Sequence, residues 1–192
     1  LSSESKAKLE HESLAMLRAV ELQGGAKNPD QFANLAEFGF RMTQTSGGQV
    51  NWEQLRQMYR TGGVAVQRMA PDTIAELEPI IGEFKGGPFA TAMRTAYNRM
   101  NGIVKLPNQA VHELMQAGIW DASKVQLNAN GGIKRFLGNP LQHADEYATN
   151  PAEYYFKYVK PFYDKQGYKD TDRARMNSMF FGSTGGMLFS KF

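Results

Sequence analysis

The sequence predicts an all-α fold, a compact multi-helix bundle of short helices with at most one small β-hairpin near residues 124–136. Three observations lead to this prediction. Apolar residues recur at three- and four-residue spacing along most of the chain, Asn-Pro and Asn-Trp pairs stand where helices would begin, and paired glycines stand where they would end. Short runs typical of strands occur at one place only, on both sides of a turn rich in asparagine and glycine.

The amino-terminal half is expected to contain helices separated by glycine and proline. The first should run from about Ser3 to Gln23, and the next two should start at Asn28 and Asn51. At both starts the asparagine side chain can accept a hydrogen bond from a free N–H of the first helical turn. A short helix over 64–69 and another that begins near residue 71 and bends at Pro79 should follow. The first helix is expected to bury a stripe made of Leu9, Leu14, Leu17 and Val20.

The carboxy-terminal half begins with a clear helix signal at Gly86-Gly87-Pro88, and a shorter helix should follow Pro107. Residues 124–127 and 133–136 flank Asn128-Ala129-Asn130-Gly131-Gly132, which predicts the hairpin. Helices should resume at Asn139-Pro140 and at Asn150-Pro151. A final helix over 172–181 and a last short one after Gly185-Gly186 complete the expected order.

The domain organisation is expected to be a single helical domain over 1–192, with a division into halves 1–85 and 86–192 as the alternative. The chain begins with Leu1 rather than methionine and ends on the apolar run Leu188-Phe189-Ser190-Lys191-Phe192. A natural carboxy terminus is more often polar, so we expect a segment of a longer protein.

Composition excludes several classes of function. The sequence has no cysteine, which rules out disulfides, a thiolate nucleophile and thiolate-bound metal centres. With 22 Lys and Arg against 19 Asp and Glu the formal charge is +3, too small to indicate a specific nucleic-acid partner. No apolar run approaches the roughly 18 residues of a membrane span.

No catalytic, cofactor-binding or metal-binding residue is predicted, and no cofactor is expected. His11, His112 and His143 fall on separate expected helices, and His112-Glu113 lacks the second histidine one turn later that a zinc motif requires. Gly182-Ser183-Thr184-Gly185 lacks the spacing of a nucleophile elbow.

The other charged and aromatic residues that could form a catalytic or phosphate-binding site are also better explained by structure. Glu76 and Glu78 point in different directions on a helix, and Glu113 and Glu146 are possible acids without a supporting motif. The basic residues are expected to form a solvated face, with phosphate contact as the alternative: Arg94, Arg99, Lys134 and Arg135. The aromatic run from Tyr154 to Tyr163 should pack in the core with its hydroxyls reaching the surface, rather than stack on bases.

The order of features in the second half resembles a known family. It runs from Gly87-Pro88-Phe89-Ala90-Thr91-Ala92-Met93-Arg94 through Leu114-Met115-Gln116-Ala117-Gly118-Ile119 and Asp121 to the glycine turn. It continues with Asn150-Pro151-Ala152-Glu153-Tyr154 and ends in Phe180-Phe181-Gly182-Ser183-Thr184-Gly185-Gly186. This order is similar to a helical region of the tail tape-measure proteins of tailed bacteriophages and prophages, over about residues 30–192.

The resemblance implies a non-catalytic structural and interaction domain that takes part in tail assembly and length determination. It implies the tail tube protein, a tail-assembly chaperone and other copies of the chain as partners. It implies a location in the virion tail after assembly in the cytoplasm of a bacterial host. Because glycine pairs and prolines interrupt the helices, this segment should be a compact domain carried on the long ruler chain, not part of the rod.

Two other functions remain open from the sequence. One is a helical peptidoglycan-degrading domain of a tail protein, a cell-wall glycan hydrolase or lyase with Glu113 or Glu146 as its acid. The other is a generic helical adaptor that binds protein or DNA.

Overall fold

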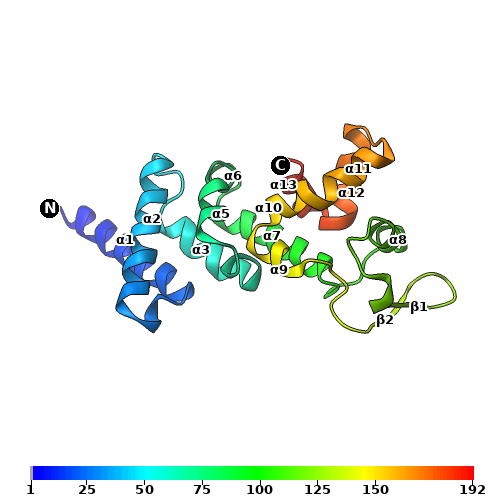
Figure 1. Cartoon of the computed structure of the whole chain (residues 1–192). Helices are drawn as coiled ribbons and strands as arrows, with labels where there is room; N and C mark the ends of the chain where they lie inside the picture. The colour runs from blue at the N-terminus through cyan, green and yellow to red at the C-terminus, as the bar shows by residue number, and fades with distance from the viewer. Residues whose placement is uncertain (1) are drawn as a thin grey trace. The chain divides into compact units, whose positions relative to one another are not determined.

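The computed structural model describes residues 2–192 and confirms the predicted fold class: helices predominate, and the one sheet among these residues is a two-stranded antiparallel hairpin. The chain forms two compact units, Leu1–Thr91 and Ala92–Phe192, and the division falls inside helix α7 (Figure 1). Within the described residues, no helix is both long and apolar enough to cross a membrane.

The first unit is built from short helices around a core of aliphatic and methionine side chains. Its buried members include Val20, Leu55, Met58 and Ile81. A 3₁₀ turn over Gly25–Lys27 joins the first two helices. The helices are α1 (Ser3–Leu22), α2 (Pro29–Thr45), α3 (Trp52–Gly62), α4 (Val64–Gln67), α5 (Pro71–Glu76), α6 (Glu78–Phe84) and the start of α7 (Gly86–Met100).

The asparagine caps of the first unit form as predicted. Asn28 Oδ1 accepts a hydrogen bond from Gln31 N at 2.7 Å, and Asn51 Oδ1 accepts one from Gln54 N at 2.9 Å. Each bond satisfies one N–H group that a helix start leaves without an intrahelical partner. The expected bend near Pro79 is a break between α5 and α6 at Leu77.

The predicted inner stripe of α1 is wrong. Leu9, Leu14 and Leu17 are 60%, 48% and 47% exposed, and among the four stripe residues only Val20 is buried. Ala15 and Ala19 are buried instead, since their small side chains allow α1 to pack closely on its neighbours. The larger leucines of α1 are therefore left on its outer face.

One glycine in the first unit is required by a close approach of two backbones. A Cβ at Gly86 would lie 2.0 Å from the carbonyl oxygen of Gln54, whereas a Cβ at Gly87 would meet nothing closer than 3.6 Å. The backbone N–H of Gly86 also donates to Gln54 Oε1 at 2.6 Å. The start of α7 is thus fixed against α3 by contact and by hydrogen bonding.

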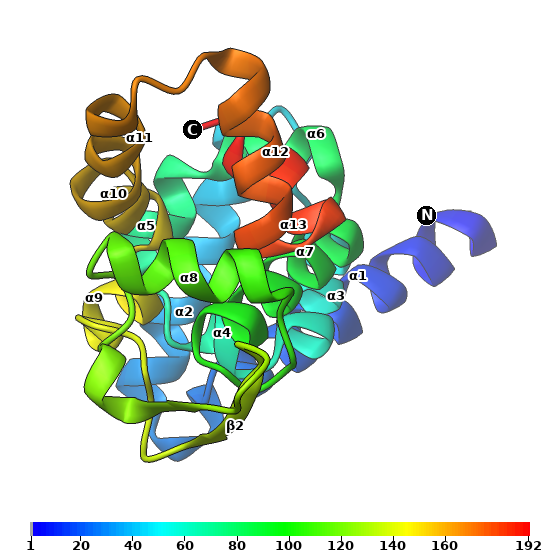
Figure 2. The same cartoon turned by 90° about the vertical axis from the view of Figure 1, so that its right-hand side faces the viewer.

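The second unit combines helices with the hairpin and has an aromatic core. Short 3₁₀ and π-helical segments cover Ala122–Lys124 and Tyr155–Val159. Its elements are the rest of α7, α8 (Asn108–Gln116), β1 (Val125–Leu127), β2 (Ile133–Phe136), α9 (Ala144–Thr149), α10 (Pro151–Tyr154), α11 (Lys160–Gln166), α12 (Asp170–Phe181) and α13 (Ser183–Phe189), as Figures 1 and 2 show.

The hairpin lies where the sequence predicts it. Val125 pairs with Phe136 and Leu127 with Ile133, with an irregularity between Gln126 and Leu127. In the turn, Asn128 Oδ1 accepts from the N–H of Gly132 at 2.9 Å. The asparagine side chain therefore closes the turn by bonding to a neighbouring backbone group.

The expected helix start at Asn139-Pro140 is wrong, because this asparagine serves a different turn. Asn139 Oδ1 accepts from the N–H of Leu141 at 2.9 Å, and Leu141 forms a bridge with Trp120. Helix α9 begins only at Ala144. At the next Asn-Pro pair the prediction holds, since Asn150 Oδ1 accepts from Glu153 N at 3.0 Å at the start of α10.

Helices α12 and α13 pack closely in the core of the second unit and lie side by side in both views (Figures 1 and 2). Phe181 of α12 and Phe189 of α13 stack with ring centroids 3.8 Å apart. A Cβ at Gly186 would lie 2.7 Å from the backbone of Ser178, so glycine is required where the two helices meet. Gly185-Gly186 lies inside α13 and does not precede it, as the sequence had suggested.

A buried asparagine bonds to three side chains at this core. Asn177 is 1% exposed; its Oδ1 accepts from the hydroxyl of Tyr163 at 2.9 Å. Its Nδ2 donates to the hydroxyl of Tyr155 and to Ser190 Oγ, each at 3.1 Å. Every polar atom of the Asn177 carboxamide thus has a partner inside the protein, which offsets the cost of burying it.

Candidate functional site

A hollow on the surface of the first unit, where α1 packs on α3, holds its most prominent group of charged side chains. We call it the arginine hollow. Its larger part has a volume of about 580 Å³ and its smaller part about 270 Å³, and the two parts share Arg18, Arg56 and Arg60. The remaining lining residues are His11, Leu14, Ala15, Glu21, Leu22 and Glu53.

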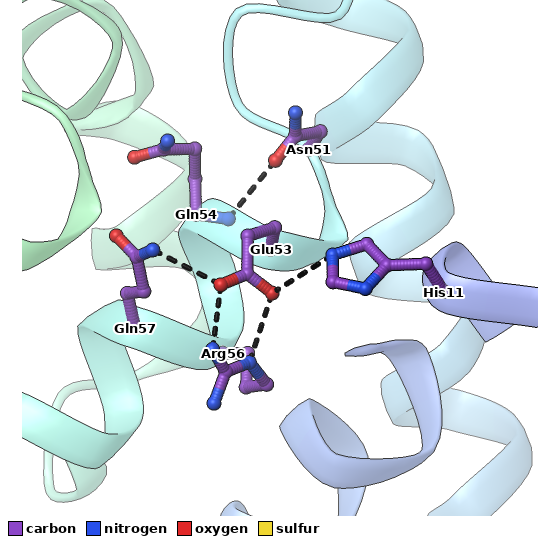
Figure 3. Close-up of polar contacts among 6 residues, drawn as sticks. All are labelled: His11, Asn51, Glu53, Gln54, Arg56 and Gln57. Carbon is purple, nitrogen blue, oxygen red and sulfur yellow. Dashed lines mark hydrogen bonds and ion pairs between the residues drawn. The ribbon is translucent and has the colours of Figure 1, made fainter. Parts of the chain in front are cut away.

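Glu53 is the centre of the polar contacts on one wall of this hollow (Figure 3). It lies in the first turn of α3 just after the Asn51 cap, where a negative charge is favoured by the helix dipole. Arg56 Nε donates to Glu53 Oε2 at 2.9 Å, and Arg56 Nη2 and Gln57 Nε2 donate to Oε1 at 2.5 and 3.0 Å. His11 Nε2 of α1 lies 3.8 Å from Oε2.

These contacts hold Glu53 ionised. The hydrogen bond from Arg56 lowers the pKa of Glu53 from 4.5 to about 2, against a smaller opposing effect of burial. The same bond raises the pKa of Arg56. Glu53 and Arg56 therefore form a fixed, mutually neutralising pair and are not poised to exchange protons near neutral pH.

The other two arginines of the hollow are exposed, Arg18 on α1 and Arg60 in the last turn of α3. In the part of the chain that the structure describes, neither has a carboxylate within ion-pair distance. Glu21 lines the hollow as well, one turn after Arg18, without forming an ion pair to it. The hollow thus presents two unneutralised guanidinium groups beside leucine and alanine side chains.

Glu146, one of the acids weighed from the sequence, belongs to a separate exposed cluster in the second unit. Its Oε2 accepts from Lys157 Nζ at 3.0 Å and from the hydroxyl of Tyr158 at 2.8 Å, and His143 Nδ1 lies 3.7 Å from Oε1. The His143 ring stacks on Tyr158 with centroids 4.7 Å apart. The hydrogen bond from Lys157, followed by that from Tyr158, lowers the pKa of Glu146. A glycosidase acid needs the opposite shift.

The remaining candidate acids and histidines do not join either cluster. Glu113 of α8 lies beside Tyr168, whose phenol has its pKa raised by burial and by this carboxylate. His112 is exposed on α8, and Glu76 and Glu78 fall in different helices, α5 and α6. Among residues 2–192, no three His, Cys, Asp or Glu side chains are grouped as metal ligands.

The expected solvated face of basic residues is wrong for Arg99. Its Nη2 donates to the carbonyl oxygen of Met179 at 2.6 Å and its Nε to that of Phe180 at 3.2 Å. It therefore satisfies carbonyls in the last turn of α12, which have no partner inside the helix. Arg94 and Lys134 are exposed, and Arg135 is exposed and donates to Gln126.

Most of the aromatic run packs in the core as predicted, but Phe156 is 46% exposed and most of the hydroxyls do not reach the surface. Those of Tyr155 and Tyr163 bond to buried Asn177, and that of Tyr154 donates to the carbonyl oxygen of Gln142 at 2.8 Å. Burial raises the pKa of all three phenols. The hydroxyl of Tyr158 donates to the carboxylate of exposed Glu146.

The arginine hollow is not predicted by the sequence alone. The three- and four-residue spacing of Glu53, Arg56 and Gln57 is a local signal that could have indicated contacts on one helix face. No local signal places Arg18 beside Arg60, because that depends on how α1 packs on α3. Comparison with known proteins adds no assignment: no protein family, no curated protein and no solved structure matches the chain.

Proposed function

We propose that the chain is a non-catalytic structural and interaction domain of a tail tape-measure protein, and that it acts in tail assembly and length determination. The observation that carries the interaction role is on α1, where Leu14 and Leu17, three residues apart on one face, are exposed on a helix held by small side chains. Large apolar side chains grouped on a surface are typical of contact sites for other proteins. The order of features from Gly87 to Gly186 supports the assignment to a tail.

The proposed partners are the tail tube protein, a tail-assembly chaperone and other copies of the chain, in a virion tail assembled in a bacterial cytoplasm. Binding is tested by size-exclusion chromatography with light scattering, using residues 1–192 mixed with each partner from the same phage. Leu14→Ser combined with Leu17→Ser should abolish the complex. Arg94→Gln, which changes an exposed residue of α7, is the control and should leave it intact.

The tail itself provides a second test. A ruler segment in one continuous helix rises about 1.5 Å per residue, so 192 residues would account for roughly 290 Å of tail. The longest described helix, α1, has 20 residues. An in-frame deletion of the segment from the phage should therefore reduce the yield of tails and shorten those that form by far less than 290 Å. Full yield and normal infectivity would contradict the proposal.

The competing enzymatic function is tested by turnover. Purified residues 1–192 should release no soluble fragments from bacterial peptidoglycan. Release that is lost in Glu113→Gln or Glu146→Gln would replace the proposal with a cell-wall hydrolase or lyase. The contacts that keep Glu146 ionised favour the non-catalytic function.

A further inference from the structure

The arginine hollow combines two features that can recognise a ligand, positive charge without a carboxylate partner and exposed apolar surface. Arg18 and Arg60 project their charges to the same hollow without a carboxylate partner in the described chain, and like charges repel. Arg56, the third guanidinium, is already bonded to Glu53. An incoming carboxylate would relieve the repulsion and form charge-assisted hydrogen bonds with one or both free arginines.

The apolar lining of the hollow defines the rest of the ligand. Leu14 and Leu22 line it and are 48% and 37% exposed. Leu14 and Leu22 are eight residues apart, a little over two turns, and so lie on one side of the helix. A ligand that covers these leucines and reaches Arg18 and Arg60 needs apolar side chains flanked by carboxylates.

A helix fits this hollow better than a polyanion does. The groove between two packed helices accepts a third helix, which presents residues at three- and four-residue spacing as one face. Glu21 and Glu53 also line the hollow, and both would repel a continuous row of phosphates. An isolated carboxylate avoids them, because it needs to approach only one arginine.

We propose that the hollow lined by Arg18, Arg56 and Arg60 is the docking site for an acidic amphipathic helix of a partner protein. The partner's leucine-like side chains cover Leu14 and Leu22, and its carboxylates bind Arg18 and Arg60. The Glu53–Arg56 pair forms a fixed part of the lining and contributes no free charge. This assignment names a surface and a partner chemistry, and it does not depend on the tape-measure assignment.

The experiment uses fluorescence anisotropy with residues 1–192 and a labelled, amidated peptide of about 15 residues, long enough to form a helix. The peptide carries leucine at positions i, i+3 and i+7 and glutamate at i+4 and i+8, and a second peptide has glutamine in place of both glutamates. Arg18→Gln and Arg60→Gln test the site. Arg94→Gln removes the same charge from an exposed helix position outside it. Circular dichroism verifies that each variant is folded.

We expect the acidic peptide to bind the wild-type chain, and each of Arg18→Gln and Arg60→Gln to weaken binding about tenfold. Arg94→Gln should change it less than about twofold, and the glutamine peptide should bind about tenfold or more weakly. No binding of the acidic peptide, or equal binding by both peptides or by the Arg18 and Arg60 variants, would overturn the proposal.

Two further outcomes would assign the hollow to another occupant and likewise overturn the proposal. One is a single-stranded oligonucleotide that binds more tightly than the peptide and depends on the same two arginines. The other is a dimer of the chain that dissociates in Arg18→Gln and Arg60→Gln, measured by light scattering without peptide.

Discussion

Replacing Asn177 with leucine should destabilise the second unit strongly, although the two side chains are similar in size. The hydroxyl of Tyr163 would lose its acceptor in a buried position, and those of Tyr155 and Ser190 would lose a donor. A buried polar group without a partner costs about 1–3 kcal/mol, which applies in full to the hydroxyl of Tyr163. The hydroxyls of Tyr155 and Ser190 are less deeply buried and should each cost less. We expect Asn177→Leu to lower the free energy of unfolding by about 2–4 kcal/mol.

The chain offers a specific probe for this measurement, because it has one tryptophan in each unit. Trp120 is buried in the second unit and donates its indole N–H to the carbonyl oxygen of Met100 at 2.7 Å. In a Trp52→Phe background, tryptophan fluorescence during urea unfolding therefore reports on the second unit alone.

A double-mutant cycle with Tyr163→Phe separates hydrogen bonding from packing. In the Tyr163→Phe background the hydroxyl is absent, so Asn177→Leu leaves one fewer buried polar group without a hydrogen-bond partner. We therefore expect Asn177→Leu to cost about 1–2 kcal/mol less in this background than in the wild-type chain, which is the coupling energy of the pair. Tyr158→Phe is the control, since its hydroxyl bonds to exposed Glu146, and it should cost less than about 0.5 kcal/mol. Additive effects of the two core changes, or a stable Asn177→Leu variant, would refute the reasoning.

Three further predictions concern the first unit. The pKa of Glu53 is lowered from 4.5 to about 2 in the folded chain, so its stabilisation is complete above pH 4.5 and is lost as the pH falls towards 2. Urea unfolding should show that the free energy of unfolding falls by about 1–2 kcal/mol between pH 7 and pH 3, after allowance for solvent screening. This part of the fall should be missing in Glu53→Gln. Gly86→Ala should cost more than about 2 kcal/mol because its Cβ would meet a backbone carbonyl, whereas Gly87→Ala should be neutral or stabilise by up to about 1 kcal/mol. Val20→Ala should cost about 1–3 kcal/mol and Leu14→Ala less than about 0.5 kcal/mol; thermal melts showing equal costs would contradict the outward orientation of Leu14.

Helix starts were predictable where one short motif decides the structure. Asn28, Asn51 and Asn150 cap helices because the bond from a side-chain oxygen to the N–H three residues on is local. The same reasoning failed at Asn139, whose oxygen binds two residues on in a turn that is held by the bridge between Trp120 and Leu141. The same Asn-Pro dipeptide therefore begins a helix at Asn150 and forms a turn at Asn139. The contact with Trp120, about 20 residues earlier in the chain, determines which of the two forms.

The faces of helices and the candidate site were less predictable, because both depend on packing between elements. Hydrophobicity placed Leu14 and Leu17 inward, but α1 packs through Ala15 and Ala19, since small side chains permit closer approach. Glu53 and Arg56 are three residues apart and visible in the sequence, whereas the grouping of Arg18 with Arg60 arises only when α1 and α3 meet. A contact between two helices far apart in the chain leaves no regular spacing of residues in the sequence that could predict it.

The two carbonyl bonds of Arg99 have a consequence for synthesis on the ribosome. They join positions 80 and 81 residues apart, and Phe189 must emerge before it can stack on Phe181. At a translation rate of about 5–20 residues per second, the amino-terminal unit is exposed for roughly 5–20 s before the last helices leave the tunnel. The aromatic side chains near residues 154–163 are made about 30 residues before the end of α13, so for roughly 2–6 s of that interval they have no α12 or α13 to cover them.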